Sequence, residues 1–223
     1  MHTGTTGIIA IDGPAGAGKS TIAKALARRL DIEYLDTGAM YRAVTVAAAR
    51  QGIPADDVER VAALARRTQI EVANGVVTVD GVDATTDIRT AETTAHVSAV
   101  AANSAVRAVM RERQRAWGEV RGGGVMEGRD IGSVVFPDAR LKLYLTASPQ
   151  VRAERRVAEA GGDVAEIAAA IARRDHLDSS RADSPLRQAD GSVVLDTTGL
   201  TIEEVLDRIE QLLAGEGEAG AHP

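Results

Sequence analysis

Gly13-Pro14-Ala15-Gly16-Ala17-Gly18-Lys19-Ser20 is the stretch that decides the fold of this chain. It matches the pattern G-x-x-x-x-G-K-[ST], and it stands between an apolar run at residues 7–12 and a helical pattern at residues 19–30. Strand, loop and helix in that order are the context in which this pattern forms a phosphate-binding loop. Glycines allow successive backbone N–H groups to point inward at the positive end of the helix, so the stretch predicts a polyphosphate site.

Two side chains at the end of this loop carry its chemistry. Lys19 is expected to bridge the β- and γ-phosphates of a nucleoside triphosphate, because its ammonium group offsets their charge. Ser20 can place its hydroxyl on Mg²⁺, which bridges the same phosphates. The sequence therefore predicts a protein that binds a nucleoside triphosphate with Mg²⁺, and it disfavours a plain glycine-rich turn.

The composition indicates a layered α/β protein. The chain has 223 residues, of which 44% are hydrophobic, so it can bury a sizeable core in one domain or in a core with insertions. Only 2% are aromatic, so that core must be built from Val, Ile, Leu and Ala. The net charge of −6 argues against non-specific binding to nucleic acid or acidic membranes. The lack of cysteine and of an apolar N-terminal run predicts a cytoplasmic location.

Short apolar runs alternate with helical patterns, which is typical of a parallel sheet covered by helices on both faces. Ligands of such sheets bind beyond the carboxyl ends of the strands. The polar side chains at these ends include Asp36, Glu127 and Arg129, so we expect them to share one edge with the phosphate loop. The predicted core strands lie at residues 8–12, 33–36, 124–127, 141–146 and 193–196.

One stretch interrupts this alternation. Residues 69–73 and 76–79 are apolar runs joined by Asn74-Gly75, and Asn-Gly supplies the positive φ angles of a type I′ hairpin turn. Residues 80–83 can continue the hairpin. Because helical patterns flank it near residues 56–67 and 90–101, we predict a small antiparallel insertion into the core and not a separate domain.

The rest of the chain separates kinases from other classes that share the loop. A GTPase needs a guanine-reading Asn-Lys-x-Asp, which this sequence lacks, and a motor ATPase normally needs a larger body. Arginines instead gather near the predicted strand ends, and two phosphorylated substrates held face to face need such charge. Arg42 and Arg129 flank tight turns there and are interpreted as functional, whereas other helix arginines, such as Arg28, are interpreted as solvated.

Several segments resemble the bacterial cytidylate kinases, a family of P-loop nucleoside monophosphate kinases. The resemblance covers nearly the whole chain, and two of its segments, residues 35–42 and 127–138, are specific to this family. The matching segments are IDGPAGAGKST at 11–21, LDTGAMYR at 35–42, EGRDIGSVVFPD at 127–138, RRDHLDSSR at 173–181 and VLDTT at 194–198.

This resemblance implies a P-loop three-layer α/β/α fold with a five-stranded parallel sheet, a small antiparallel β insertion in the monophosphate-binding region and a short helical lid. Residues 1–223 would form a single kinase domain. Its core would comprise about 7–63, 103–151 and 164–214, with the insertion at about 64–102 and the lid at about 152–163.

The implied reaction is Mg²⁺-dependent transfer of the γ-phosphate of ATP to CMP or dCMP, which yields ADP and CDP or dCDP. The catalytic residues would be Lys19, Arg129, Arg174 and Arg181. ATP would contact Gly13, Pro14, Ala15, Gly16, Ala17, Gly18, Lys19, Ser20 and Thr21, and also Arg155 and Arg156 of the lid, with Ser20 on the metal.

For the acceptor, the resemblance implies a separate set of residues. Asp178 would bind the sugar hydroxyls, and Arg174 would be shared between the phosphates. The CMP phosphate would be held by Thr37, Arg42, Arg129 and Arg181, and the cytosine edge would be read by Ser98, Arg107 and Asp130. Small-molecule substrates are the only expected partners, without nucleic acid or membrane, and the chain is expected to be a monomer.

Two positions depart from the family's pattern, and two other functions stay open. Thr37 stands where Ser is frequent and keeps the hydroxyl, and Glu127 stands where Asp is frequent and keeps the carboxylate. One alternative is a kinase for another monophosphate such as UMP or AMP, which the base-reading residues decide. The other is a regulatory or assembly protein that binds ATP without transferring phosphate, and the second set of anion-binding residues argues against it.

Overall fold

Five parallel strands form the central sheet, in the order β2-β6-β1-β7-β8. The structure is a computed structural model that describes residues 7–73 and 75–219. Each strand begins and ends within one residue of its predicted bounds, so the predicted sheet is confirmed. The strands are β1 (Gly7–Asp12), β2 (Tyr34–Asp36), β6 (Gly123–Glu127), β7 (Leu141–Thr146) and β8 (Val193–Asp196).

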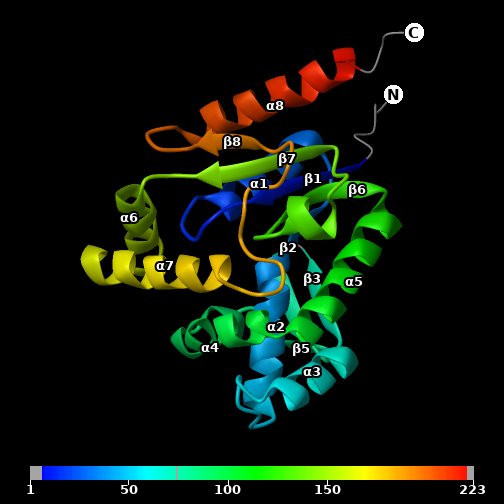
Figure 1. Cartoon of the computed structure of the whole chain (residues 1–223), viewed down its shortest axis with the longest axis vertical. Helices are drawn as coiled ribbons and strands as arrows, with labels where there is room; N and C mark the ends of the chain where they lie inside the picture. The colour runs from blue at the N-terminus through cyan, green and yellow to red at the C-terminus, as the bar shows by residue number, and fades with distance from the viewer. Residues whose placement is uncertain (1–6, 74, 220–223) are drawn as a thin grey trace.

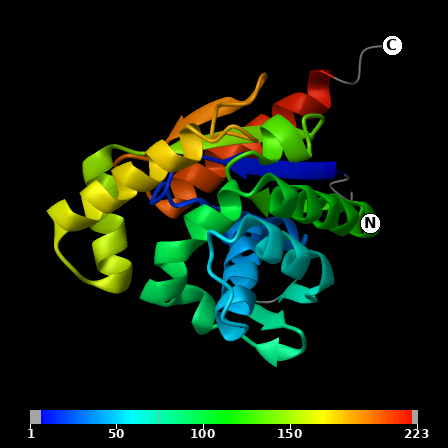
Figure 2. The ribbon, with the colours of Figure 1, turned by 60° about the horizontal axis from the view of Figure 1, so that its bottom comes forward.

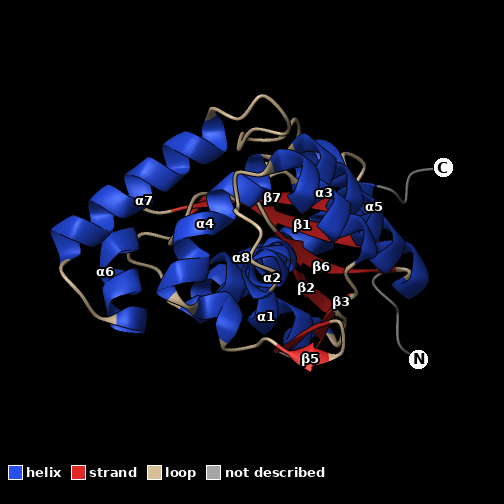
Figure 3. Ribbon diagram, turned by 90° about the horizontal axis from the view of Figure 1, so that it is seen from below, coloured by secondary structure: helices blue, strands red, loops and turns tan. Residues whose placement is uncertain are grey.

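Helices cover both faces of this sheet because its strands are apolar on both sides. Ile9 and Ile11 of β1 pack in one core cluster with α1 (Lys19–Leu30) and α8 (Ile202–Ala219). Ile8 and Ala10 pack on the opposite face with α2 (Thr37–Arg50) and α5 (Ser104–Arg121). Figure 3 shows β7, β1, β6 and β2 in this order between the helices. The predicted three-layer α/β/α arrangement is therefore confirmed.

The predicted insertion is a small antiparallel sheet between two helices. Val77 and Val79 are buried and belong to the same core cluster as α2, which explains why the insertion packs on the core. Asn74, in the predicted hairpin turn, lies outside the described residues. The sheet consists of β3 (Ile70–Ala73), β4 (Val76–Val79) and β5 (Val82–Asp83), with α3 (Val58–Arg67) before it and the short 3-10 helix η1 (Asp87–Arg89) and α4 (Ala91–Ala102) after it.

Two further helices pack against each other at the side of the sheet. These are α6 (Pro149–Ala160) and α7 (Val164–Ser179), and each has an N-cap side chain, Ser148 and Asp163, that accepts a backbone N–H bond. The predicted lid at residues 152–163 corresponds to most of α6 and the turn after it. In Figures 1 and 2 this pair and the α2–α4 region stand on two sides of the carboxyl edge of the sheet. Within the described ranges, no helix is long and apolar enough to cross a membrane.

Candidate active site

The phosphate loop leaves a side-chain-free cradle at the start of α1. Gly13, Gly16 and Gly18 have φ angles of +147°, +75° and +84°. A Cβ atom on Gly13 would lie only 2.0 Å from the Leu145 carbonyl oxygen, so the backbone there needs glycine. Lys19 is buried beside the cradle and donates from Nζ to the Pro14 carbonyl oxygen at 2.7 Å. Burial, and next the charge of Arg129, lower the pKa of Lys19 to about 7.

A hydroxyl and a carboxylate lie at the far end of the cradle, where a Mg²⁺ ion would be needed. Ser20 is exposed at the start of α1, and its hydroxyl is close enough to Glu127 to favour the ionised carboxylate. Glu127 is buried and accepts a hydrogen bond from the Tyr34 hydroxyl. Among the described residues, no group of three or more His, Cys, Asp or Glu side chains could hold a metal ion. This donor set fits an ion that takes most of its ligands from phosphate oxygens and water.

Three arginines surround the carboxylate of Asp178 on α7. Arg129 donates from Nε to Asp178 at 2.9 Å, and Arg181 and Arg174 lie 3.6 and 4.0 Å from its oxygens. Burial alone would raise the pKa of Asp178, but these three charges outweigh it and hold the pKa below its usual value. Burial and then the charges of Arg129 and Arg42 lower the pKa of Arg174 to about 10. The cations here therefore repel one another, and a bound anion would relieve that repulsion.

Thr37 and Arg42 enter the same region from α2. The Thr37 hydroxyl donates to the Glu127 carbonyl oxygen at 2.6 Å, which ties the start of α2 to the end of β6. Arg42 donates to the Ile88 carbonyl oxygen at 3.0 Å and to the Thr94 hydroxyl at 2.9 Å. Burial, and next the charge of Arg156, lower its pKa. Arg42 thus links α2 to the insertion while remaining part of the cationic group.

The predicted base-reading residues lie on the insertion side of the edge. Arg107 on α5 and Asp130, just after β6, form a buried ion pair. The Arg107 guanidinium also lies 5.5 Å from the centre of the Tyr41 ring and donates to the Ala101 carbonyl oxygen at 3.2 Å. Ser98 lies one turn before Ala101 on α4. The fold therefore gathers these residues around one point, with a cation, an acid and an aromatic ring.

The two predicted lid arginines lie apart from each other. Arg155 is held against the loop after β8, where it donates to the hydroxyl and the carbonyl oxygen of Thr197, both at 2.9 Å. Arg156 forms an exposed ion pair with Glu159 at 3.0 Å, yet its charge still acts on Arg42 and Arg174. Arg155 therefore lies next to the phosphate loop, and Arg156 lies at the outer rim of the cationic group.

Sequence reasoning did not include two residues that shape this site. Asp12 accepts from the backbone N–H groups of Ile131 and Gly132 at 2.8 and 2.7 Å, so it fixes the loop after β6. Asp175 accepts from the Ala15 N–H at 2.9 Å and pairs with Arg152, so it ties α7 to the phosphate loop. The signal for Asp12 was its place between strand and loop, and that for Asp175 was its place one turn before Asp178.

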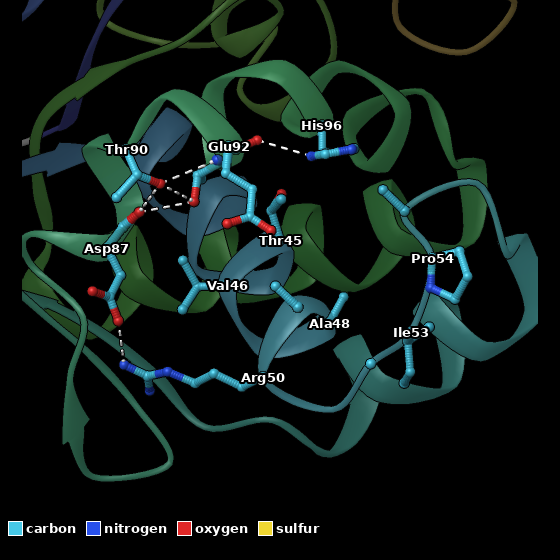
Figure 4. Close-up of a pocket in the computed structure, with 14 residues that line it drawn as sticks. Thr45, Val46, Ala48, Arg50, Ile53, Pro54, Asp87, Thr90, Glu92 and His96 are labelled. Carbon is cyan, nitrogen blue, oxygen red and sulfur yellow. Dashed lines mark hydrogen bonds and ion pairs between the residues drawn. The ribbon is translucent and has the colours of Figure 1, made fainter.

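A separate cavity of about 490 Å³ lies away from these residues. It is lined by α2, η1, α4 and the loop at residues 52–55, and the predicted site residues take no part in it. Figure 4 shows the ion pair of Arg50 and Asp87 at one end and the apolar side chains of Val46 and Ile53 along its floor. Because it has no cationic group free of a partner among its lining residues, this cavity does not suit a nucleotide phosphate.

Comparison with known proteins gives one consistent result. The family model described as cytidylate kinase matches residues 9–214. A cytidylate kinase of Desulfitobacterium hafniense is 49% identical over 220 residues, which cover 95% of this chain and 94% of that protein. A cytidylate kinase of Corynebacterium efficiens is 47% identical and covers 95% of this chain and 96% of its own length. A solved shikimate kinase of Acinetobacter baumannii superposes with a TM-score of 0.51 at 14% identity, covering 95% of each chain, which is a likeness of fold.

Proposed function

This chain belongs to the cytidylate kinase family, and from that premise we propose that it transfers the γ-phosphate of ATP to CMP or dCMP. The observation that supports the proposal most directly is the group of partly buried arginines beside the phosphate loop. Arg42, Arg129, Arg174 and Arg181 come from α2, the end of β6, α7 and the loop after it. A protein that only bound ATP would have no use for this second anion-binding site. The alternative of a protein that binds ATP without transferring phosphate is therefore set aside.

The donor side is built from the glycine cradle and Lys19. The backbone N–H groups of the loop would hold the β- and γ-phosphates, and Lys19 would exchange its bond to the Pro14 carbonyl for one to a phosphate oxygen. Ser20 is the residue that would hold Mg²⁺, and the ion would offset phosphate charge when bound. Arg155 and Thr197 lie where they could contact the rest of the ATP molecule.

On the acceptor side, the CMP phosphate would lie among the arginines. Arg129, Arg181, Arg42 and the Thr37 hydroxyl would hold that phosphate, and Arg174 would contact both phosphates. Because two anions approach each other in this reaction, catalysis would consist of positioning and charge stabilisation, and no covalent intermediate with the enzyme is needed. Asp178 would accept hydrogen bonds from the sugar hydroxyls while Arg129 turns part of its donor capacity to the phosphate.

The base would be read by the Arg107 and Asp130 pair with Ser98. Cytosine offers a ring nitrogen acceptor, a carbonyl acceptor and an amino donor, and an arginine beside an acid complements that set. Uracil differs from cytosine at the amino donor. UMP is therefore the main alternative substrate, and this part of the base is where the site must distinguish the two. The monomeric state and the cytoplasmic location stay predictions.

The first test is ADP formation from ATP and Mg²⁺ with CMP, dCMP, UMP, AMP and GMP at equal concentrations. We expect CMP and dCMP to be the best acceptors. Asp130→Asn keeps the size of the side chain and should raise KM for CMP while KM for ATP changes little. A different preferred base would leave the kinase mechanism and reject the base-reading role of Ser98, Arg107 and Asp130.

A further inference from the structure

We propose that Tyr34 is a positioning residue for the metal side of the reaction, because its hydroxyl holds the carboxyl group of Glu127 behind Ser20. Nothing in the sequence pattern of the phosphate loop points to Tyr34, which lies 14 positions beyond Ser20 at the start of β2. The inference rests on the proposed function in one respect only, namely that Ser20 holds the Mg²⁺ ion of the donor nucleotide.

The strand register brings Tyr34 and Glu127 to the same face of the sheet. Tyr34 is paired with Val125, and Asp36 is paired with Glu127, in the parallel ladder between β2 and β6. Side chains alternate along a strand, so Val125 and Glu127 point to the same side. Val125 belongs to the cluster under α1, and Tyr34 packs against that cluster. Tyr34 and Glu127 therefore meet beneath α1, where the Tyr34 hydroxyl donates to Oε1 of Glu127.

Helix α1 packs over β2 and β6, where Tyr34 and Glu127 meet. Ser20 and Lys24 are four positions apart and so lie on the same face of the helix. Lys24 places its Nζ 5.8 Å from the centre of the Tyr34 ring, and Ser20 is near both the Tyr34 hydroxyl and the Glu127 carboxyl group. The ring is thus held at its face by Lys24 and at its hydroxyl by Glu127, which fixes the direction of the hydroxyl.

Glu127 needs such a donor because of where it lies. Only 4% of the residue is exposed, and the carboxylate of Asp36 is a like charge nearby. A buried carboxylate that lacks hydrogen-bond donors is costly and turns toward whichever donor remains. Glutamate has three rotatable side-chain bonds, so without the Tyr34 hydroxyl its carboxyl group would lean toward the Lys19 ammonium. That movement would take away the acceptor that faces the Ser20 hydroxyl proton.

Tyr34 on β2, Glu127 on β6 and Ser20 on α1 therefore have different roles. Glu127 accepts from Tyr34 and lies close to the Ser20 hydroxyl, so it can accept the hydroxyl proton and leave the lone pairs of the Ser20 oxygen to a cation. Tyr34 does not touch substrate or metal in this arrangement. Its effect passes through Glu127, and it should be visible only when the metal is present.

The decisive variant is Tyr34→Phe, which removes one hydroxyl and keeps the ring. We would measure binding of a non-hydrolysable ATP analogue by calorimetry, once with Mg²⁺ and once with EDTA. Loss of one hydrogen bond to a charged group predicts roughly 10-fold or more weaker binding with Mg²⁺ and a change below about 2-fold with EDTA. Equal weakening under both conditions, or none with Mg²⁺, would overturn the proposal. Neither arm depends on which monophosphate is the acceptor, so failure here is distinct from failure of the proposed function.

Two further variants identify the path of the effect. Tyr34→Phe combined with Glu127→Met should bind the metal-bound analogue no more weakly than Glu127→Met alone, because Glu127→Met already removes the oxygen that accepts from Tyr34. Multiplied effects would mean that Tyr34 acts elsewhere. Lys24→Met removes the charge above the ring but keeps the hydroxyl, and we expect a change below about 2-fold. If this variant lost as much as Tyr34→Phe, the ring contact and not the hydroxyl would be responsible.

Discussion

Arg129 shows how much one side chain of this site is expected to do. Arg129 donates to Asp178, and its charge lowers the pKa values of Lys19 and Arg174 after the effect of burial. We expect Arg129→Ala to lower kcat/KM for CMP by roughly 100-fold or more, since charge aimed at the transferring phosphate is worth several kcal/mol. Steady-state kinetics would measure this, and calorimetry should show ATP affinity changed by less than about 3-fold.

The matched control is Arg28→Ala, because Arg28 is an exposed arginine on α1 that donates to the Lys24 carbonyl oxygen within its own helix. It should leave both constants near those of the parent enzyme. Retained turnover in Arg129→Ala would remove Arg129 from the mechanism, whatever happens to ATP binding.

Asp12 is a second residue with a measurable signature, in the pH dependence of stability. Burial raises its pKa to about 6, although two backbone N–H groups favour the charged form. The folded state therefore keeps a proton on Asp12 between about pH 4 and pH 6 that the unfolded state has lost, so this group makes stability fall as pH rises through that window. The difference in unfolding free energy between the parent and Asp12→Asn, from urea titrations, should fall over this window and be flat above about pH 7. A flat difference throughout would contradict it.

At the level of elements, the strands and most helices were predictable because their local signals agree. Parallel strands buried on both faces produce continuous apolar runs, as in β1 at residues 7–12. The partners of the long arginines were not predictable. Arg129 and Asp178 are 49 positions apart, and Arg155 and Thr197 are 42 apart, so only the packing of α7 and β8 on the core decides which groups meet.

The conformation of the phosphate loop depends on glycine at position 13. Gly13→Ala combines a φ of +147° with a Cβ atom 2.0 Å from the Leu145 carbonyl oxygen, so either the loop or β7 must move. We expect a loss of about 2 kcal/mol or more in unfolding free energy and a large loss of ATP affinity, measured by urea titration and calorimetry.

Gly81→Ala is its control, because Gly81 also has a positive φ, +78°, but nothing lies within 4 Å of its added Cβ. Backbone strain alone should then cost about 1 kcal/mol, and ATP affinity should be unchanged. Equal losses in the two variants would mean that the contact with β7 does not constrain the loop.

On the scale of the whole molecule, the fold concentrates positive charge in a protein whose net charge is −6. Residues from α2, β6, α7 and the phosphate loop bring the cations together at one edge of the sheet, between the α2–α4 region and the α6–α7 pair seen in Figure 1. Burial and then neighbouring like charges lower the pKa values of Lys19, Arg42 and Arg174, so these cations repel one another and the rest of the fold must overcome that repulsion. Asp178 and Glu127 offset part of it.

A simple dianion should therefore stabilise the protein as a whole. We expect the thermal midpoint to be higher in sodium sulfate than in sodium chloride at equal ionic strength, by about 2–5 °C, because an anion that binds only the folded state adds RT ln(1 + [L]/Kd) to its stability. Sulfate also strengthens apolar burial in general, so the informative quantity is the comparison with Arg174→Met, which keeps an apolar stem but removes the most strongly perturbed arginine. Calorimetric scans should show a clearly smaller gain from sulfate in that variant. A gain as large as that of the parent would mean that the arginine group does not act as an anion site, and the second half of the proposed mechanism would lose its physical basis.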